Sequence, residues 1–425
     1  MLLRLAAIAA LAVVPVLQAQ ERPPTGVLTL DNAIERVAQT HPDLRLFNGR
    51  KDVLQANYDS ASLRPPLMLG GMIENAPGTG GYSGFKQAEV TVTLAGVLER
   101  GGKLDARRAL AQANIDSLAP QREVTRLDLL ADTARRYLAI TAAIEQRKIA
   151  ELDIEQRKRT VEAARRRLEA GASPESVVLT AQAALAEAEL DRDRAKQSEQ
   201  AARQSLAALW NGRDPAAGDV AGDPMSLPSL EEFQQLGALL DKTPELAVLA
   251  GETRIREAQV RLARSDAAGD IQWQVGGRAF RNGNDVGLLA GVTIPLGAAS
   301  RAQPGIRAAE AELSLSSVER EGLMVRLYST LSAAYGEYTT ARMEVERLRT
   351  DVFPRLAKAE QAADRAWRAG AISYMEWAML QDQRVQARRR QLDTAISAQA
   401  SLIEIQRLIG QPIVQVSANY SGTVQ

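Results

Sequence analysis

Two stretches of the sequence, RRRLEAGASPESVVL (residues 165–179) and DRAWRAGAISYMEWA (residues 364–378), interrupt long runs of residues that favour helix. Inside a helix, Gly is about 1 kcal/mol less favourable than Ala, and Pro is about 3 kcal/mol less favourable. Gly often ends a helix in a left-handed conformation, and Ser often caps the helix that follows. Gly171 and Gly370 therefore predict two tight turns between helices, 199 positions apart in the chain.

A similar offset relates other pairs of segments, so the chain is predicted to be an internal duplication. THPDL around Pro42 returns as KTPEL around Pro244, and EAGAS returns as RAGAIS. Longer segments correspond at similar spacing: 28–47 with 228–249, 92–113 with 292–313, and 205–212 with 401–410. We predict four parts after the N-terminal leader: a first repeat (20–212), a linker rich in Gly, Pro and Asp (213–228), a second repeat (229–412) and a C-terminal tail (413–425).

The N-terminus has the pattern of a secretory signal peptide over residues 1–19. Arg4 supplies the positive charge, residues 5–16 form an apolar run, and Ala19 ends a suitable cleavage site. The alternative is a membrane anchor, but the run is shorter than the roughly 20 residues that span a bilayer as helix. We therefore expect an exported protein that enters a membrane, if at all, through strands.

The composition excludes several classes of function. Lys+Arg and Asp+Glu both number 52, so the basic excess of a nucleic-acid-binding protein is absent. There is no Cys and only one His, which excludes thiolate and multi-His metal sites and a Cys nucleophile. No G-x-S-x-G motif occurs either. We expect no enzyme activity, catalytic residue, cofactor or bound metal, and we interpret His41 as a turn residue, because Thr243 replaces it in the second repeat.

Each repeat is predicted to contain two short helices and then, after a segment of another character, two long ones. The short helices are expected at 29–40, 43–63, 229–241 and 245–265, and the long ones at about 103–170, 174–210, 305–369 and 374–409. A helix over 103–170 would be roughly 100 Å long and needs partners along its length, as in a coiled coil. Pro120 and Pro354 lie inside the long runs and should kink them.

Between the short and the long helices, each repeat shows the period-two alternation of a strand pair. The four strands are expected at about 66–76, 86–95, 270–280 and 285–294. Four strands cannot close a membrane barrel, so strands that enter lipid must be pooled from several chains. The alternative is two soluble hairpins packed on helices. Four aromatic residues near strand ends are candidates for a girdle at the membrane surface: Tyr82, Phe85, Trp273 and Phe280.

The order of signal peptide, duplication, helices, hairpin and long helices resembles that of TolC-type outer-membrane efflux ducts. Two motifs, ENAPG (74–78) and LERGGKLDAR (98–107), resemble the CzcC-like heavy-metal branch of that family, which tends to carry ENP and E-x-GGKR. The sequence departs from the branch pattern by inserting Ala76 and by placing Leu104 where the branch often has Arg.

The resemblance implies a mainly α fold with a β membrane part: a homotrimer with a twelve-stranded barrel in outer-membrane lipid and an α-barrel through the periplasm. It also implies two protein partners, a periplasmic adaptor (membrane fusion) protein and an inner-membrane pump of the RND type. The duct would be a passive path for heavy-metal cations such as cobalt, zinc, cadmium or copper. Alternatives are a duct for drugs or secreted proteins, or a soluble periplasmic coiled-coil scaffold.

The two turns are the predicted docking edge for the adaptor, with capping of the helices as the simpler explanation of the same residues. They comprise Gly171, Ala172, Ser173, Gly370, Ala371, Ile372 and Ser373. Glu376 is the candidate for an acidic ring at the periplasmic gate, although a Glu in a first turn also complements the helix dipole. The arginines before the turns could latch the gate, but a solvated helix face is the preferred interpretation: Arg165, Arg166, Arg167, Arg365 and Arg368.

Overall fold

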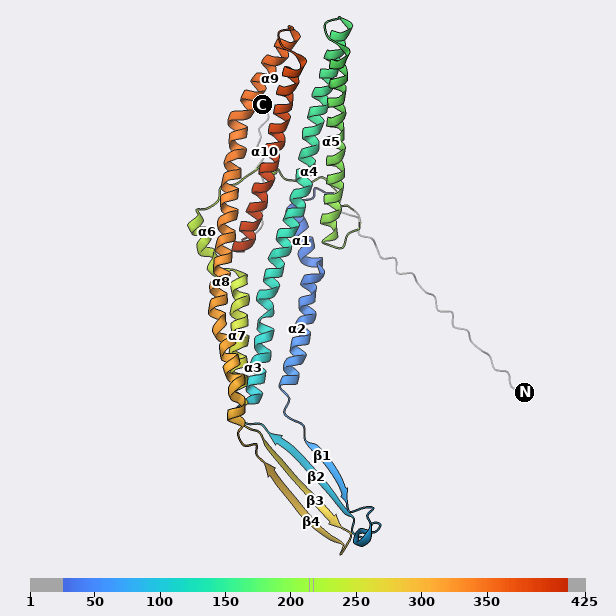
Figure 1. Cartoon of the computed structure of the whole chain (residues 1–425), viewed down its shortest axis with the longest axis vertical. Coiled ribbons are helices and arrows are strands. Elements are labelled where there is room, and N and C mark those ends of the chain that lie inside the picture. The colour runs from blue at the N-terminus through green and yellow to red at the C-terminus, as the bar shows by residue number, and fades with distance from the viewer. Residues whose placement is uncertain (1–25, 214, 217, 412–425) are drawn as a thin grey trace, which may run out of the picture.

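The computed structural model describes residues 26–411, except 214 and 217, as long helices that stand on a small β-sheet (Figure 1). The predicted mainly α fold with four strands is confirmed. The predicted signal peptide and C-terminal tail lie outside the described residues. None of the described helices has an apolar stretch of the length and hydropathy needed to cross a bilayer.

Both halves of the chain follow one order of elements. The first half contains α1 (Leu30–Thr40), α2 (Pro42–Ala61), β1 (Met68–Glu74), a 3₁₀ turn (Gly80–Tyr82), β2 (Glu89–Leu98), α3 (Lys103–Asp116), α4 (Leu118–Glu169) and α5 (Glu175–Ala208). The second half contains α6 (Phe233–Leu239), a 3₁₀ turn (Leu240–Lys242), α7 (Pro244–Ser265), β3 (Ile271–Phe280), β4 (Asp285–Thr293), α8 (Ala298–Arg347), a π-helical turn (Leu348–Val352), α9 (Phe353–Arg368) and α10 (Tyr374–Ile409).

Polar N-cap residues and prolines set the first residues of the short helices. Thr29 accepts a hydrogen bond from the Asn32 backbone N–H at 3.2 Å and so caps α1. His41 caps α2, because its Nδ1 accepts from the Asp43 backbone N–H at 3.2 Å. Thr243 is the N-cap of α7, the equivalent helix of the second half. His41 thus occupies a capping position that the second half fills with Thr.

The first long helix is not continuous, contrary to the single helix predicted over 103–170. It is divided at Ser117 into α3 and α4, and Pro120 falls in the first turn of α4, where a missing backbone N–H costs no hydrogen bond. In the second half, a π-helical turn immediately precedes α9, and Pro354 lies in the first turn of α9. Both irregularities are therefore adjacent to the two prolines that were expected to kink the helices.

Apolar side chains hold the long helices together. On α4, four residues of one face are buried: Leu127, Ala131, Ala134 and Ala142 each have less than a tenth of their surface exposed. One apolar cluster joins α1, α4 and α5, and a second joins α6, α8 and α10. Leu and Ala together supply most of the buried residues of both clusters, and the helix backbones can approach closely where Ala lies between them.

Two equivalent tyrosines fasten the middle of the molecule. Tyr137 on α4 and Tyr338 on α8 are completely buried. The Tyr137 hydroxyl donates to the backbone oxygen of Leu28 at 2.8 Å, and the Tyr338 hydroxyl donates to that of Pro228 at 2.5 Å. Burial raises the pKa of both phenols, that of Tyr338 to about 12. Each hydroxyl therefore stays neutral and ties an irregular segment to a long helix.

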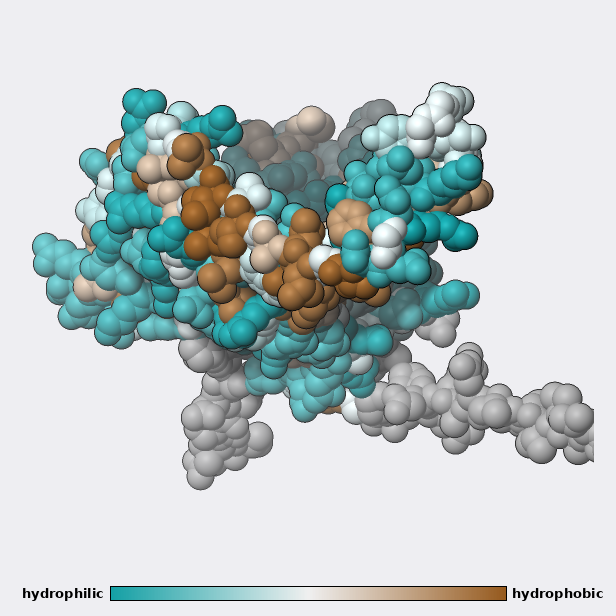
Figure 2. Space-filling view, turned by 90° about the horizontal axis from the view of Figure 1, so that it is seen from below, coloured by the Kyte–Doolittle hydropathy of each residue, from teal (hydrophilic) through white to brown (hydrophobic). Residues whose placement is uncertain are grey.

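The sheet has the order β1-β2-β3-β4, with every neighbouring pair antiparallel. Its register places Leu69 opposite Leu94, Leu94 opposite Val275 and Val275 opposite Ala290. One face is therefore apolar across all four strands and is exposed, as Figure 2 shows in a view from the loop end. Its most exposed large side chains are Leu69, Ile73, Val92, Val286, Leu288 and Val292.

The opposite face of the sheet is polar. Arg278 lies at its centre and donates to Thr91 at 2.9 Å and to Glu89 at 3.0 Å. The pleat also assigns the aromatic candidates to faces. Trp273 lies on the apolar face against Gly96, whereas Phe280 lies on the polar face beside Gly287. Phe280 and Trp273 thus cannot belong to one girdle on the same face, because their positions along the strand differ by an odd number of residues.

The motif LERGGKLDAR forms the junction between sheet and helices. Arg107 donates to Glu99 at 3.0 Å, and the Lys103 ammonium binds Asp270, at the start of β3, at 2.8 Å. Gly101 has a φ of +74°, and a Cβ there would lie 2.7 Å from the Ser265 backbone oxygen. The glycine lets the two halves approach, and the ion pair between Lys103 and Asp270 connects them at this point.

Candidate functional site at the helical tips

The two predicted turns lie at the ends of the helical hairpins α4–α5 and α9–α10, at the opposite end of the molecule from the sheet (Figure 1). They have the same hydrogen bonds. The Gly171 N–H donates to Leu168 O at 2.9 Å and the Ala172 N–H to Arg167 O at 2.8 Å. Gly370 and Ala371 repeat this pattern, and both glycines have a positive φ. Each turn is therefore a Schellman motif, in which Gly ends the helix.

The helices that leave the turns are capped differently. Ser373 is the N-cap of α10, as expected for a Ser after such a turn. In the first turn Pro174 occupies the N-cap position of α5 and makes no side-chain bond, so Ser173 is not a cap. The equivalence assumed between Ser173 and Ser373 is wrong, because Pro174 and Ser373 both lie three residues after their Gly.

Glu376 completes a capping box with Ser373. The Ser373 backbone N–H and hydroxyl each donate to Glu376 Oε2 at 2.8 Å, and the Glu376 N–H donates back to Ser373 Oγ at 3.3 Å. Two hydrogen bonds lower the pKa of the Glu376 carboxyl. The larger effect comes from the Ser373 backbone N–H, and the smaller one comes from the Ser373 hydroxyl. The group is exposed and carries a negative charge whose orientation is set by the cap.

Near the tips an apolar cluster connects the two hairpins. It includes side chains of α4, α5, α9 and α10. At its centre the rings of Trp367 and Trp377 stack 4.1 Å apart with an interplanar angle of 13°, and Tyr374 meets Trp377 edge-on. Trp367 and Trp377 are both almost fully buried. This stack was not predicted from the sequence, although two of only four Trp in the chain flank the second turn.

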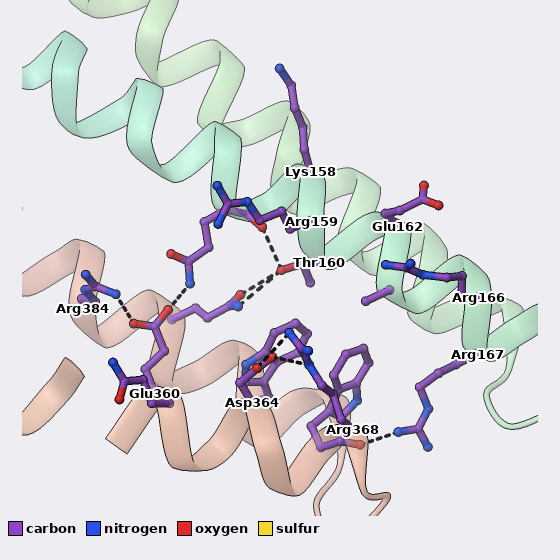
Figure 3. Close-up of a pocket in the computed structure, with 16 residues that line it drawn as sticks. Lys158, Arg159, Thr160, Glu162, Arg166, Arg167, Glu360, Asp364, Arg368 and Arg384 are labelled. Carbon is purple, nitrogen blue, oxygen red and sulfur yellow. Dashed lines mark hydrogen bonds and ion pairs between the residues drawn. The ribbon is translucent and has the colours of Figure 1, made fainter. Parts of the chain in front are cut away.

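Polar bridges between the hairpins surround the aromatic cluster (Figure 3). Arg167 donates to the backbone oxygen of Trp367 at 2.5 Å, and its guanidinium lies 5.3 Å from the Trp367 ring centre. Further from the tips, Arg157 of α4 binds Asp382 of α10 at 2.6 Å. Of the predicted latch candidates, Arg167 thus joins the hairpins, whereas Arg368 pairs with Asp364 of its own helix at 2.9 Å.

Burial raises the pKa of one carboxyl group beneath these bridges. Asp153 is almost fully buried and pairs with Arg157 at 3.0 Å. Desolvation raises the pKa of Asp153, although the charge of Arg157 and its hydrogen bonds oppose this effect.

In the described part of the chain, no group of three or more His, Asp or Glu side chains is arranged to hold a metal ion. Glu74 is on the sheet, and Glu99 is in the junction. The tips therefore combine a buried aromatic cluster with exposed charged side chains, and the described residues there hold no arrangement suited to a bound metal.

Comparisons with known proteins agree with this arrangement. Residues 33–212 match the family described as outer membrane efflux protein. The cobalt-zinc-cadmium resistance protein CzcC of Cupriavidus metallidurans is 26% identical over 92% of both chains. The nickel-cobalt-cadmium resistance protein NccC of Alcaligenes xylosoxydans is 24% identical over 73% of this chain and 70% of its own. The crystal structure of CusC superposes with a TM-score of 0.75 at 17% identity, covering 90% of this chain and 92% of that one.

Long paired helices that stand on an antiparallel sheet with one apolar face are the fold that this chain shares with CusC. The chain resembles the outer membrane efflux proteins, by the family model over residues 33–212 and by its relatives over most of its length.

The different capping of the two tips leads to a prediction. Ser373→Ala removes the capping box of α10 and should lower the free energy of unfolding of the tip by about 1 kcal/mol. Ser173→Ala is the matched control and should change it by less than about 0.3 kcal/mol, because Ser173 caps no helix. Hydrogen exchange of the amides after each turn measures both effects. Equal protection loss in the two variants would show that the capping difference is wrong.

Proposed function

We propose that the chain is the passive outer-membrane duct of a tripartite system that exports heavy-metal cations such as cobalt, zinc, cadmium or copper. The observation that supports this cargo is the similarity to CzcC, which extends over 92% of both chains. Ducts for drugs or secreted proteins share the fold, but the motifs ENAPG and LERGGKLDAR favour the metal branch. The chain would catalyse no reaction and would only supply the path.

The working unit in this proposal is a homotrimer. Strands β1 and β4 are the outer strands of the sheet, and the outer edge of each has no partner strand within the described chain. Edges cannot remain unpaired in lipid, so β4 of one copy would pair antiparallel with β1 of the next, and three copies would close twelve strands. On the same side of the molecule as β4, α8 exposes an apolar stripe suited to a neighbouring copy: Leu315, Val318, Val325 and Tyr328.

The orientation of the sheet in lipid gives a testable difference between adjacent residues. Leu288 is 97% exposed on the apolar face, whereas Leu289 lies on the polar face, which would line the pore. Leu288→Lys should destabilise the inserted barrel by about 2–4 kcal/mol, and Leu289→Lys by less than about 1 kcal/mol. Urea unfolding of the protein in lipid vesicles measures both. A larger loss for Leu289→Lys would place the apolar face in the pore and contradict the proposal.

We infer that both tips are the docking edge for a periplasmic adaptor. This edge includes Ile372, beside the second turn. The adaptor would couple the duct to an inner-membrane pump of the RND type. What supports this is the pair of identical Schellman turns at the end furthest from the membrane sheet. The tips expose apolar side chains such as Leu179, Met375 and Met379, which a partner helix could cover.

We also propose that Glu376 forms the acidic ring of the periplasmic gate. In a trimer, three carboxylates around a narrow pore favour cations and hinder anions. Glu376→Gln removes the charge but keeps a side chain that completes a capping box. The variant should lower cation-to-anion selectivity in single-channel recordings by about threefold or more. Glu175→Gln, which removes an exposed first-turn charge at the other tip, is the matched control. Unchanged selectivity in Glu376→Gln would leave Glu376 with its capping role alone.

Growth of a deletion strain tests the proposed cargo. Loss of the gene should lower tolerance to cobalt, zinc or cadmium by at least twofold in inhibitory concentration, and the wild-type gene should restore it. A panel of organic drugs serves as the comparison. Altered drug tolerance with unchanged tolerance to every metal would contradict the heavy-metal assignment and favour a drug duct.

A further inference from the structure

A cleft of about 950 Å³ lies between the two helical hairpins just behind the tips (Figure 3). One wall is α4, and the other is formed by α9 and the start of α10. The stacked pair Trp367 and Trp377 contributes to its lining. The cleft is thus bounded by both hairpins and lies next to the turns, outside the capping residues already described.

Positive charge predominates in the cleft. Three acidic side chains line it, Glu162, Glu360 and Asp364, against six basic ones, Lys158, Arg159, Arg166, Arg167, Arg368 and Arg384. Such a surplus disfavours a divalent metal cation as the occupant and favours an anionic group.

Most of the basic groups already have partners. Arg384 binds Glu360, Arg368 binds Asp364, and Lys158 pairs with Glu155. Arg167 is held by the Trp367 backbone oxygen and lies over the Trp367 ring. These contacts fix the walls of the cleft, and the carboxylates neutralise the charges of Arg384, Arg368 and Lys158.

Arg159 and Arg166 differ from the other basic groups because, within the described residues, neither guanidinium has a carboxylate within 4 Å, and neither is held by a backbone oxygen and an aromatic ring as Arg167 is. They are seven positions apart on α4, so two helical turns bring them to the same side of the helix. Glu162 lies between them in the sequence and forms an ion pair with neither. Two exposed guanidiniums on one wall are therefore available to an incoming acceptor.

A buried donor on the other wall lacks an acceptor. Trp377 is only 5% exposed and lines the cleft, yet its indole Nε1–H has no hydrogen-bond partner in the described structure. A buried donor without an acceptor costs about 1–3 kcal/mol. An acceptor that enters the cleft would satisfy it.

From these groups we propose that the cleft binds a carboxylate carried by an acidic segment of the periplasmic adaptor. A carboxylate only accepts hydrogen bonds, so each of these donors, the guanidiniums of Arg159 and Arg166 and the Trp377 N–H, is a suitable partner for one. A volume of about 950 Å³ exceeds that of a small free anion and suits a peptide segment. This inference rests on the proposed role of the chain as a duct that docks an adaptor, and it specifies the chemistry of that contact.

Peptide binding to the purified trimer tests the inference. The probe is an eight-residue peptide of alternating Glu and Gly, and its counterpart has Gln in place of Glu. Binding is followed by Trp fluorescence at low salt and by thermophoresis of labelled peptide. The Glu peptide should bind, and its affinity should fall at least fivefold when salt rises from about 20 to 200 mM. Equal binding of the Gln peptide, or no binding of the Glu peptide, would overturn the proposal.

Matched variants assign the binding to the cleft. Arg159→Gln with Arg166→Gln should weaken the Glu peptide at least tenfold, and Trp377→Phe, which keeps a ring in the stack, at least threefold. Arg165→Gln with Arg365→Gln removes the same charge close to the tips but outside the cleft and should change affinity less than twofold. Equal losses in the two double variants would indicate unspecific attraction, and loss of the trimer in the first would indicate that a second copy of the chain fills the cleft.

Peptide binding and metal tolerance, measured side by side, separate this inference from the proposed function. If the Glu peptide fails to bind while the wild-type gene still restores metal tolerance, the cleft proposal is wrong and the duct proposal stands. If the peptide binds as expected but metal tolerance never depends on the gene, the cargo is wrong and the acidic contact stands.

Discussion

The unpaired edges of a four-stranded sheet are the constraint on which the rest of the molecule depends. Backbone groups at an edge cannot remain without partners in lipid, so a sheet with one apolar face and two open edges requires other copies of itself. Duplication of the chain supplies the sheet as two hairpins. The junction holds the hairpins together through Lys103 and Asp270, which belong to different halves. The helices α3 and α8 then start just after β2 and β4 end, so the sheet sets where both long helical runs begin.

The helices in turn are held by contacts of two kinds. Apolar clusters of Leu and Ala bring them together in the middle of the molecule, where Tyr137 and Tyr338 fasten the irregular segments. Towards the tips, stacked aromatic rings join the packing, and Asp153 is buried with a raised pKa. Ion pairs connect α4 and α10 both in the middle, between Arg135 and Glu404, and near the tips, between Arg157 and Asp382. Such contacts respond to salt more than apolar ones do.

Much of this could be predicted from the sequence because the signals are local. Gly171 and Gly370 mark the turns, and period-two alternation marks the strands. The break at Ser117 was missed. A proline within a helix-favouring run indicates that the helix is disturbed, but it does not indicate at which residue. Ser173 was misassigned because it was matched to Ser373 by residue type. Counted from Gly171, the position equivalent to Ser373 is Pro174, which is the N-cap. The contact between Trp367 and Arg167 joins residues 200 positions apart, and nothing in either local sequence indicates the other.

The two tips share the glycine turn but continue into different helix starts, and this difference has a consequence for stoichiometry. A trimer presents six Schellman turns with the same backbone geometry, but only three of them continue into a Ser373–Glu376 box beside Trp377. A partner that contacts only the glycine turn would find six equivalent binding positions around the ring. A partner that also needs the aromatic and acidic groups would find only three binding positions. Bound partners would then alternate with vacant positions around a threefold axis.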